Sequence, residues 1–226
     1  MGIDMQTKRD ISSFELYLFD WDGTLNSMGV VHRSYENLQR AIKKWNKDSK
    51  LKDIEKSKKK LKEKAIEEER KNLLVAALFD VLLIFVRPKL HNDTIKLIQY
   101  LRDHGKKVAI LSNGRGARLR KELKILGIEG MFDAVVSAKD IKAIKPDPYG
   151  IHYVARKLGC KTKDTLYIGD TSDDILTAFL AKVPSCAVAN GFHSRRTLQS
   201  AQPDYIFSGL EEMLKALNAK GRKNAN

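Results

Sequence analysis

From Pro88 onward, short apolar runs alternate with stretches in which apolar residues recur at helical spacing. The apolar runs "KVAILSNG", "DAVVS", "TLYIGD" and "SCAVAN" predict β-strands, and "LYLF" at 16–19 predicts another near the N-terminus. Helices are predicted between them, at "ARLRKELKILG", "DPYGIHYVARKLG", "SDDILTAFLAK" and "GLEEMLKAL". Strands that alternate with helices of this length indicate βαβ units, and therefore an α/β fold with a Rossmann-like three-layer core around a parallel sheet.

Helix-capping residues mark the start of one of these helices and of a further helix before the strand "KVAILSNG". Asn92 or Asp93 is expected to cap a helix that Gly105 terminates. Asp147 is expected to cap the helix that starts at Pro148, because proline fits the first helical position.

The tract at 26–87 differs from the rest of the chain. It is nearly free of Gly and Pro and rich in Lys, Glu, Leu and Ala, a composition that favours long helices. Its second half is apolar almost all round, which suggests a helix packed against a charged partner in an antiparallel hairpin. We therefore expect a core domain at 1–25 and 88–226 and a helical domain inserted at 26–87.

The chain is strongly basic, and the excess charge is unevenly spread. Its formal net charge is +14, and residues 40–72 contain fourteen Lys or Arg against seven Asp or Glu. A run of this kind is usually a solvated helix face, and nucleic acid is the weaker alternative as a partner. Single-stranded nucleic-acid sites combine basic residues with aromatic residues on which the bases stack. In this basic segment, aromatic residues are not interleaved with the basic ones.

Apolar segments and cysteines point to a cytoplasmic protein without a membrane anchor. The N-terminus has no apolar signal sequence, and the apolar stretch at 73–86 is interrupted by Asp80 and too short to span a bilayer. Cys160 and Cys186 are far apart and lack metal-site spacing, so we expect two reduced thiols.

Two aspartates follow directly on the first predicted strand. Asp20 and Asp22 flank Trp21, and Gly23 and Thr24 come next. Two carboxylates this close resist ionising together unless a cation lies between them. The pair therefore raises the question of which cation it binds.

Polar side chains also follow the other predicted strands. In an open parallel sheet, ligands bind beyond the carboxyl ends of the strands, so these residues are expected to meet at one edge. Each alone is ordinary loop chemistry, but four successive strand exits in a consistent order are hard to explain as turns. The residues are Asp20 and Asp22, then Ser112, Asn113 and Gly114, then Lys145 one loop after its strand, and finally Asp170 and Asp174.

The charges of this set favour a divalent metal. Four aspartates bring up to four negative charges, and Lys145 returns one positive charge. All the candidate ligands are oxygen atoms, which indicates Mg²⁺, an ion that keeps coordination positions open for water and a substrate phosphate.

These motifs resemble those of the haloacid dehalogenase-like hydrolase superfamily. "FDWDGTL" is similar to its first motif, "LSNG" to its second, "KPDP" to its third and "GDTSDD" to its fourth, in the right order and spacing. The insert between the first two motifs resembles the helical cap of the branch that includes phosphoglycolate phosphatases and sugar-phosphate mutases. Such caps close over the site and select the substrate.

The resemblance implies a role for each motif residue. Asp20 would be the nucleophile that forms a phospho-aspartyl intermediate, and Asp22 would protonate the leaving oxygen and later activate water. Asp20, Asp170 and the main-chain carbonyl of Asp22 would hold Mg²⁺. The resemblance further implies phosphoryl-binding residues, Ser112, Asn113 and Lys145, and supporting residues, Thr24, Gly114 and Asp174.

Asp22 separates the possible reactions within this family. Dehalogenase members lack an acid at this position, because a halide leaves without a proton. We therefore expect an Mg²⁺-dependent phosphatase that acts on a small phosphorylated metabolite, as a monomer or homodimer. A sugar-phosphate mutase and a basic nucleic-acid-binding protein with an incidental phosphatase core are the alternatives. A phospho-receiver is disfavoured because it has no large helical insert.

Overall fold

The computed structural model of the chain describes residues 9–27, 88–114 and 116–221. Apart from Asn26 and Ser27, the predicted helical insert at 26–87 lies outside the described residues, as do the basic run at 40–72 and the last five residues. Among the helices that the structure describes, none is long and apolar enough to cross a membrane.

The described part is built on a six-stranded parallel sheet with the strand order β3-β2-β1-β4-β5-β6. The register places Phe19, at the end of β1, beside Ile110 of β2 and Ile168 of β4. All the strands therefore end at one edge of the sheet. Their bounds are β1 Leu16–Phe19, β2 Lys107–Ser112, β3 Ala134–Ser137, β4 Thr165–Gly169, β5 Ser185–Val188 and β6 Tyr205–Phe207.

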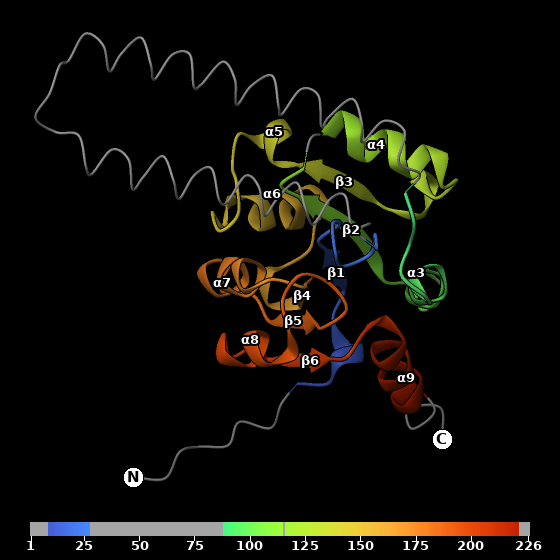
Figure 1. The fold of residues 1–226 in the computed structure, drawn as a ribbon, viewed down its shortest axis with the longest axis vertical. Helices are drawn as coiled ribbons and strands as arrows, with labels where there is room; N and C mark the ends of the chain where they lie inside the picture. The colour runs from blue at the N-terminus through green and yellow to red at the C-terminus, as the bar shows by residue number, and fades with distance from the viewer. Residues whose placement is uncertain (1–8, 28–87, 115, 222–226) are drawn as a thin grey trace, which may run out of the picture. The chain divides into compact units, whose positions relative to one another are not determined.

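Helices follow most of the strands and return the chain to the opposite edge of the sheet (Figure 1). The helices that the structure describes are α3 Thr94–Asp103, α4 Gly116–Ile125, α5 Ala138–Ile141, α6 Tyr149–Lys157, α7 Ser172–Ala181, α8 Arg195–Ser200 and α9 Leu210–Gly221. Short 3-10 turns occur at η1 Ile11–Ser13, η2 Glu129–Met131 and η3 Thr162–Asp164.

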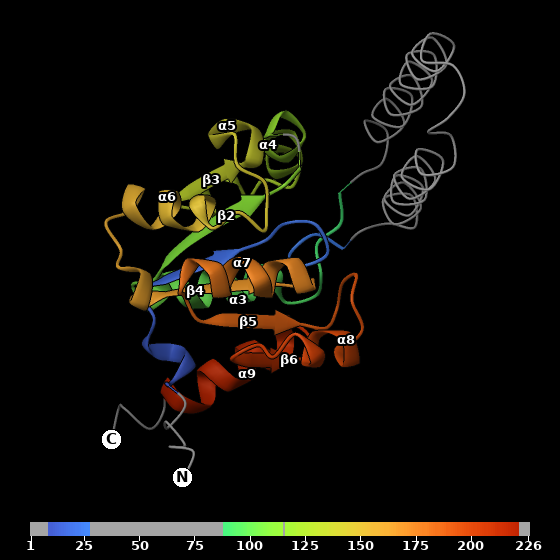
Figure 2. The same ribbon diagram turned by 90° about the vertical axis from the view of Figure 1, so that its left-hand side faces the viewer.

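The sheet lies between two layers of helices, α6 and α7 on one side and α3, α4 and α9 on the other (Figure 1), and Figure 2 views it from the side of α6 and α7. Successive side chains of a strand point to opposite faces. Tyr17 and Phe19 of β1 therefore join a buried cluster with α3, α4 and α9, whereas Leu16 and Leu18 join another with α6 and α7. Both faces are apolar, as expected for a parallel sheet that is covered on each side. This confirms the predicted three-layer α/β fold.

The five predicted strands and five predicted helices of this part are all present. One helix start differs, because α6 begins at Tyr149 with Pro148 as its N-cap residue. Asp147 still accepts a hydrogen bond from the Tyr149 N–H at 2.8 Å. The sequence analysis did not identify β6, α5 or α8, which are three, four and six residues long and too short for a periodic pattern.

Helix α4 offers a matched test of the packing. Leu123 is fully buried, whereas Ile125 on the same helix is 54% exposed. We expect Leu123→Ala to lower the free energy of unfolding by about 2–5 kcal/mol, because it removes buried methyl groups and leaves a cavity. Ile125→Ala should change it by about 0.5 kcal/mol or less. Urea unfolding of both variants measures the difference, and equal losses would place α4 outside the core.

Candidate active site

The site lies at the edge where the parallel strands end, between β1 and β4. Asp20 follows β1 directly and Asp170 follows β4 directly, and these two strands are neighbours in the sheet. The strand order reverses here, since β2 and β3 lie on one side of β1 and the later strands on the other. Ligands of open α/β sheets bind at such a switch point.

Three aspartates form a compact carboxylate cluster at this edge. Asp20, Asp170 and Asp174 each place a carboxylate oxygen within 4.8 Å of the others. All three side chains are buried. Asp174 belongs to the first turn of α7, where its Oδ2 accepts hydrogen bonds from the Thr171 N–H at 3.1 Å and the Thr171 hydroxyl at 2.6 Å. This capping box fixes the third carboxylate of the cluster.

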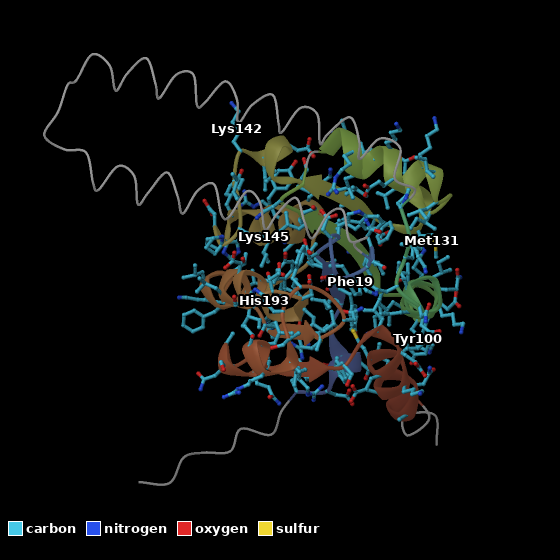
Figure 3. All side chains as sticks on the ribbon, viewed as in Figure 1. Phe19, Tyr100, Met131, Lys142, Lys145 and His193 are labelled. Carbon is cyan, nitrogen blue, oxygen red and sulfur yellow. The ribbon has the colours of Figure 1, made fainter. Side chains whose placement is uncertain are left out.

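Lys145 projects into the cluster from the loop between α5 and α6 (Figure 3). Its Nζ lies 2.5 Å from Asp20 Oδ1 and 2.8 Å from Asp174 Oδ1. Asp174 Oδ1 also accepts a hydrogen bond from the Tyr167 hydroxyl at 3.1 Å. Asn113 holds the lysine loop in place, because its Oδ1 accepts a hydrogen bond from the Lys145 N–H at 2.9 Å. The second and third motifs are thereby joined.

Burial dominates the ionisation of the cluster. It raises the pKa of Asp20 well above its ordinary value, although Lys145 opposes this, and Asp174 adds to it. Burial and then Asp174 raise the pKa of Asp170 to about 7. Burial lowers the pKa of Lys145, but Asp174 and Asp20 outweigh it and raise that pKa well above the ordinary value. Asp20 and Asp170 therefore favour their protonated forms, and a bound cation would shift both towards the ionised form.

Asp170 is enclosed by backbone that approaches it closely. Its Oδ1 accepts a hydrogen bond from the Thr24 hydroxyl at 2.9 Å, and its Oδ2 accepts one from the Phe192 N–H at 2.6 Å. A Cβ at Gly23 would lie 2.3 Å from Asp170 Oδ2, and one at Gly191 would lie 1.9 Å from it. Gly23 also has a φ of +93°, which side-chain-bearing residues rarely adopt. Both positions therefore need glycine.

The cluster has the donor chemistry of a divalent metal site. Buried carboxylates that share a single cationic neighbour leave negative charge for a metal ion to neutralise. The donors are hard oxygen atoms, which suit Mg²⁺ or Ca²⁺. Asp20, Asp170 and Asp174 are close enough together to bind one such ion.

Ser112 ends β2, the neighbour of β1 in the sheet, and is buried. Its Oγ accepts a hydrogen bond from the Gly114 N–H at 3.0 Å. A Cβ placed on Gly114 would lie 3.1 Å from Ser112 Oγ and 3.2 Å from Asp22 Oδ2. Ser112 Oγ and Asp22 Oδ2 therefore both lie beside Gly114, and the absence of a side chain on Gly114 keeps the space next to them open.

The Asp22 side chain is oriented differently from that of Asp20. Its Oδ2 accepts a hydrogen bond from the guanidinium of Arg118 in α4, whereas its Oδ1 is buried and has no hydrogen-bond partner among the described residues. Trp21, between the two aspartates, is fully buried and donates its indole N–H to Glu122 at 2.7 Å. The sequence analysis did not identify Arg118 or Glu122. Their i,i+4 spacing, which places both on one face of α4, is the signal that the sequence offers for them.

Comparisons with known proteins identify relatives of the chain. Residues 17–188 match the model of the haloacid dehalogenase-like hydrolase family. The chain is 28% identical over 132 residues to pyrophosphatase PpaX of Halalkalibacterium halodurans, covering 58% of this chain and 61% of that protein. It is 25% identical over 127 residues to a phosphoglycolate phosphatase of Mannheimia succiniciproducens, covering 56% and 57%. The alignments thus span about three fifths of these curated relatives.

Solved structures share the fold over most of the chain. One is a predicted phosphoglycolate phosphatase from Haemophilus somnus 129pt, with a TM-score of 0.69, 21% identity and coverage of 91% of this chain and 98% of that one. Another is a hydrolase from Pseudomonas syringae, with a TM-score of 0.69, 19% identity and coverage of 91% and 98%. With the match of the family model to residues 17–188, these findings show that the chain belongs to the haloacid dehalogenase-like hydrolases.

Proposed function

We propose that the protein is an Mg²⁺-dependent phosphatase that hydrolyses a small phosphorylated metabolite through a phospho-aspartyl intermediate. The observation that carries this proposal is the buried Asp20 carboxylate at the end of β1, held by Lys145 beside Asp170 and Asp174. The names of the aligned relatives, phosphoglycolate phosphatase and pyrophosphatase, support a phosphorylated substrate.

The residues divide the reaction between them. An Asp20 oxygen attacks the phosphorus, so that a new P–O bond forms as the bond to the leaving oxygen breaks. Asp22 gives its proton to that leaving oxygen, then takes one from the water that hydrolyses the aspartyl phosphate. Ser112 and Lys145 bind the phosphoryl oxygens, and Asn113 keeps the lysine loop in position.

Asp20, Asp170 and the main-chain carbonyl of Asp22 would hold the metal, with Asp174 beside them. The bound ion would supply positive charge that stabilises the phosphoryl group during transfer. Within the described residues, Lys145 is the cation that pairs with this cluster, through Asp20 and Asp174.

We also propose that residues 26–87 form a helical cap. The described residues at the start of this tract and on either side of it support the proposal. The Ser27 N–H donates to the Lys89 carbonyl at 2.6 Å, and the His91 N–H donates to the Leu25 carbonyl at 3.0 Å. The tract thus leaves and rejoins the core at one point, a few residues after Asp22, which suits an insert that controls access to the site.

Replacing the nucleophile tests the mechanism. We expect Asp20→Asn to lower kcat by about 10³-fold or more, because it removes the attacking carboxylate and keeps the side-chain shape. The fold should persist, since the variant relieves charge repulsion in a buried cluster. Phosphate release from a panel that includes phosphoglycolate and pyrophosphate provides the assay, with Asp173→Asn as the exposed control. If Asp20→Asn retained activity within tenfold of the wild type, Asp20 could not be the nucleophile.

Asp22 is tested by the leaving group. If it is the acid, Asp22→Asn should lower turnover of an alkyl phosphate by about 10²–10⁴-fold. Turnover of para-nitrophenyl phosphate should fall much less, because its leaving group needs little protonation. Both substrates are measured across an Mg²⁺ titration. Equal losses that excess metal restores would show that Asp22 is a ligand and not the acid.

Protons and the metal should compete for the cluster. The pKa of Asp170 is about 7 in the folded chain, above the ordinary 3.8, so the folded state binds the extra proton. In the presence of a chelator, the free energy of unfolding should therefore fall as the pH rises from about 4 to about 7. Mg²⁺ displaces the proton, so its affinity should rise with pH by about tenfold or more per pH unit below 7.

Thermal unfolding with EDTA or Mg²⁺ at pH 6 and pH 8 measures this competition. The increase in Tm on adding Mg²⁺ should be larger at pH 8, and Asp170→Asn should lose most of it. An equal increase at both pH values would contradict proton competition at the cluster.

A further inference from the structure

Helix α4 provides two charged side chains to the loop that carries the catalytic aspartates. Arg118 and Glu122 are separated by one helical turn, and Arg118 Nη1 lies 3.7 Å from Glu122 Oε1. Arg118 donates to Asp22 Oδ2, and Glu122 accepts the indole N–H of Trp21 at 2.7 Å. Two consecutive residues of the loop, Trp21 and Asp22, are therefore attached to the same face of α4.

The position of Arg118 is set from both sides. Its side chain is 23% exposed and lies between two carboxylates, those of Asp22 and Glu122. Burial raises the pKa of Glu122, Arg118 lowers it and Asp22 raises it again, so the guanidinium separates two acids that repel each other. A planar guanidinium with several fixed donors suits such a two-sided contact better than a lysine does.

Gly114 leaves room for the pair. A Cβ at this position would lie 2.7 Å from Arg118 Nη2 and 3.2 Å from Asp22 Oδ2. Any side chain there would therefore force the guanidinium or the carboxylate to move. Gly114, in the second motif, thus leaves space for the contact between Arg118 of α4 and Asp22 of the first motif.

We propose that Arg118 is a positioning residue for Asp22, an inference that rests on the proposed phosphatase function. A proton-transferring carboxylate has to present one oxygen to the leaving group and then to water. Arg118 binds Oδ2 and leaves Oδ1, which is buried and lacks a hydrogen-bond partner in the described part of the chain. The guanidinium thereby fixes the carboxylate and keeps its other oxygen available for the proton.

The chain offers a matched pair of arginines for the test. Arg118 and Arg120 lie on the same helix, but Arg120 is about half exposed and pairs with Asp140 at 3.3 Å, away from the site. Arg118→Met and Arg120→Met keep an unbranched side chain and high helix propensity while removing the charge. Arg118→Lys keeps the charge and folding but cannot reproduce the two-sided contact.

Steady-state kinetics on phosphoglycolate and para-nitrophenyl phosphate distinguish the roles. We expect Arg118→Met to lower kcat on the alkyl ester by about 10- to 100-fold with little change in KM, the usual effect of a misplaced catalytic group. Turnover of para-nitrophenyl phosphate should change by about threefold or less, since its leaving group departs without full protonation. Arg118→Lys should fall between the wild type and Arg118→Met, and Arg120→Met should match the wild type.

A double-mutant cycle shows whether Arg118 acts through Asp22. In an Asp22→Asn background, Arg118→Met should cost almost nothing further, because the group that it positions is gone. Additive losses, equal losses on both esters, a rise in KM alone, or an Arg118→Met that behaves like Arg120→Met would each overturn the proposal. A wild-type chain that hydrolyses neither ester, nor any other phosphorylated compound of the panel, would instead refute the proposed function, so the two failures are distinguishable.

Discussion

The site depends on one interaction, the contact of the buried Lys145 ammonium with Asp20 and Asp174. Nζ lies 2.5 Å from one carboxylate and 2.8 Å from the other. Three carboxylates within 4.8 Å of one another would repel strongly in a medium from which water is excluded. Among the described residues, Lys145 offsets part of that repulsion, and the remaining charge suits the cluster to a divalent cation.

That contact explains why the surrounding backbone is so constrained. Lys145 comes from a loop that Asn113 fixes, and Asp174 comes from a helix start that Thr171 caps. Asp170 is enclosed by Gly23 and Gly191, where a Cβ would collide with its carboxylate. Each charged group therefore has its own support from a different strand exit, as a site that must hold like charges close together requires.

Much of this arrangement could be predicted from the sequence, for a physical reason. Strands of a covered parallel sheet are apolar on both faces, so each appears as a short run of apolar residues, and the residue after each run must lie at one edge. Asp20, Ser112 and Asp170 were found in this way. The elements that were not predicted, such as β6 with only Tyr205–Phe207, are too short to produce a pattern.

Partners within the site were harder to predict than its members. Asp22 and Arg118 are separated by 96 positions in the chain, and no local spacing relates them. The sequence analysis assigned Trp21 to packing, and burial of the indole is consistent with that interpretation, but its N–H bond to Glu122 follows only from where α4 lies on the sheet. Contacts between side chains depend on the packing of whole elements, which a linear pattern does not specify.

The triplet at 20–22 lies directly after the end of β1. Alternation along an extended chain directs Trp21 away from its two neighbours but does not separate Asp20 from Asp22. The three residues nevertheless have different partners, namely Lys145, Glu122 and Arg118. Asp20 thereby joins the buried cluster, Trp21 attaches the loop to α4, and Asp22 stays outside the cluster. Two carboxylates only one residue apart can then perform different tasks, because each is governed by a different cation.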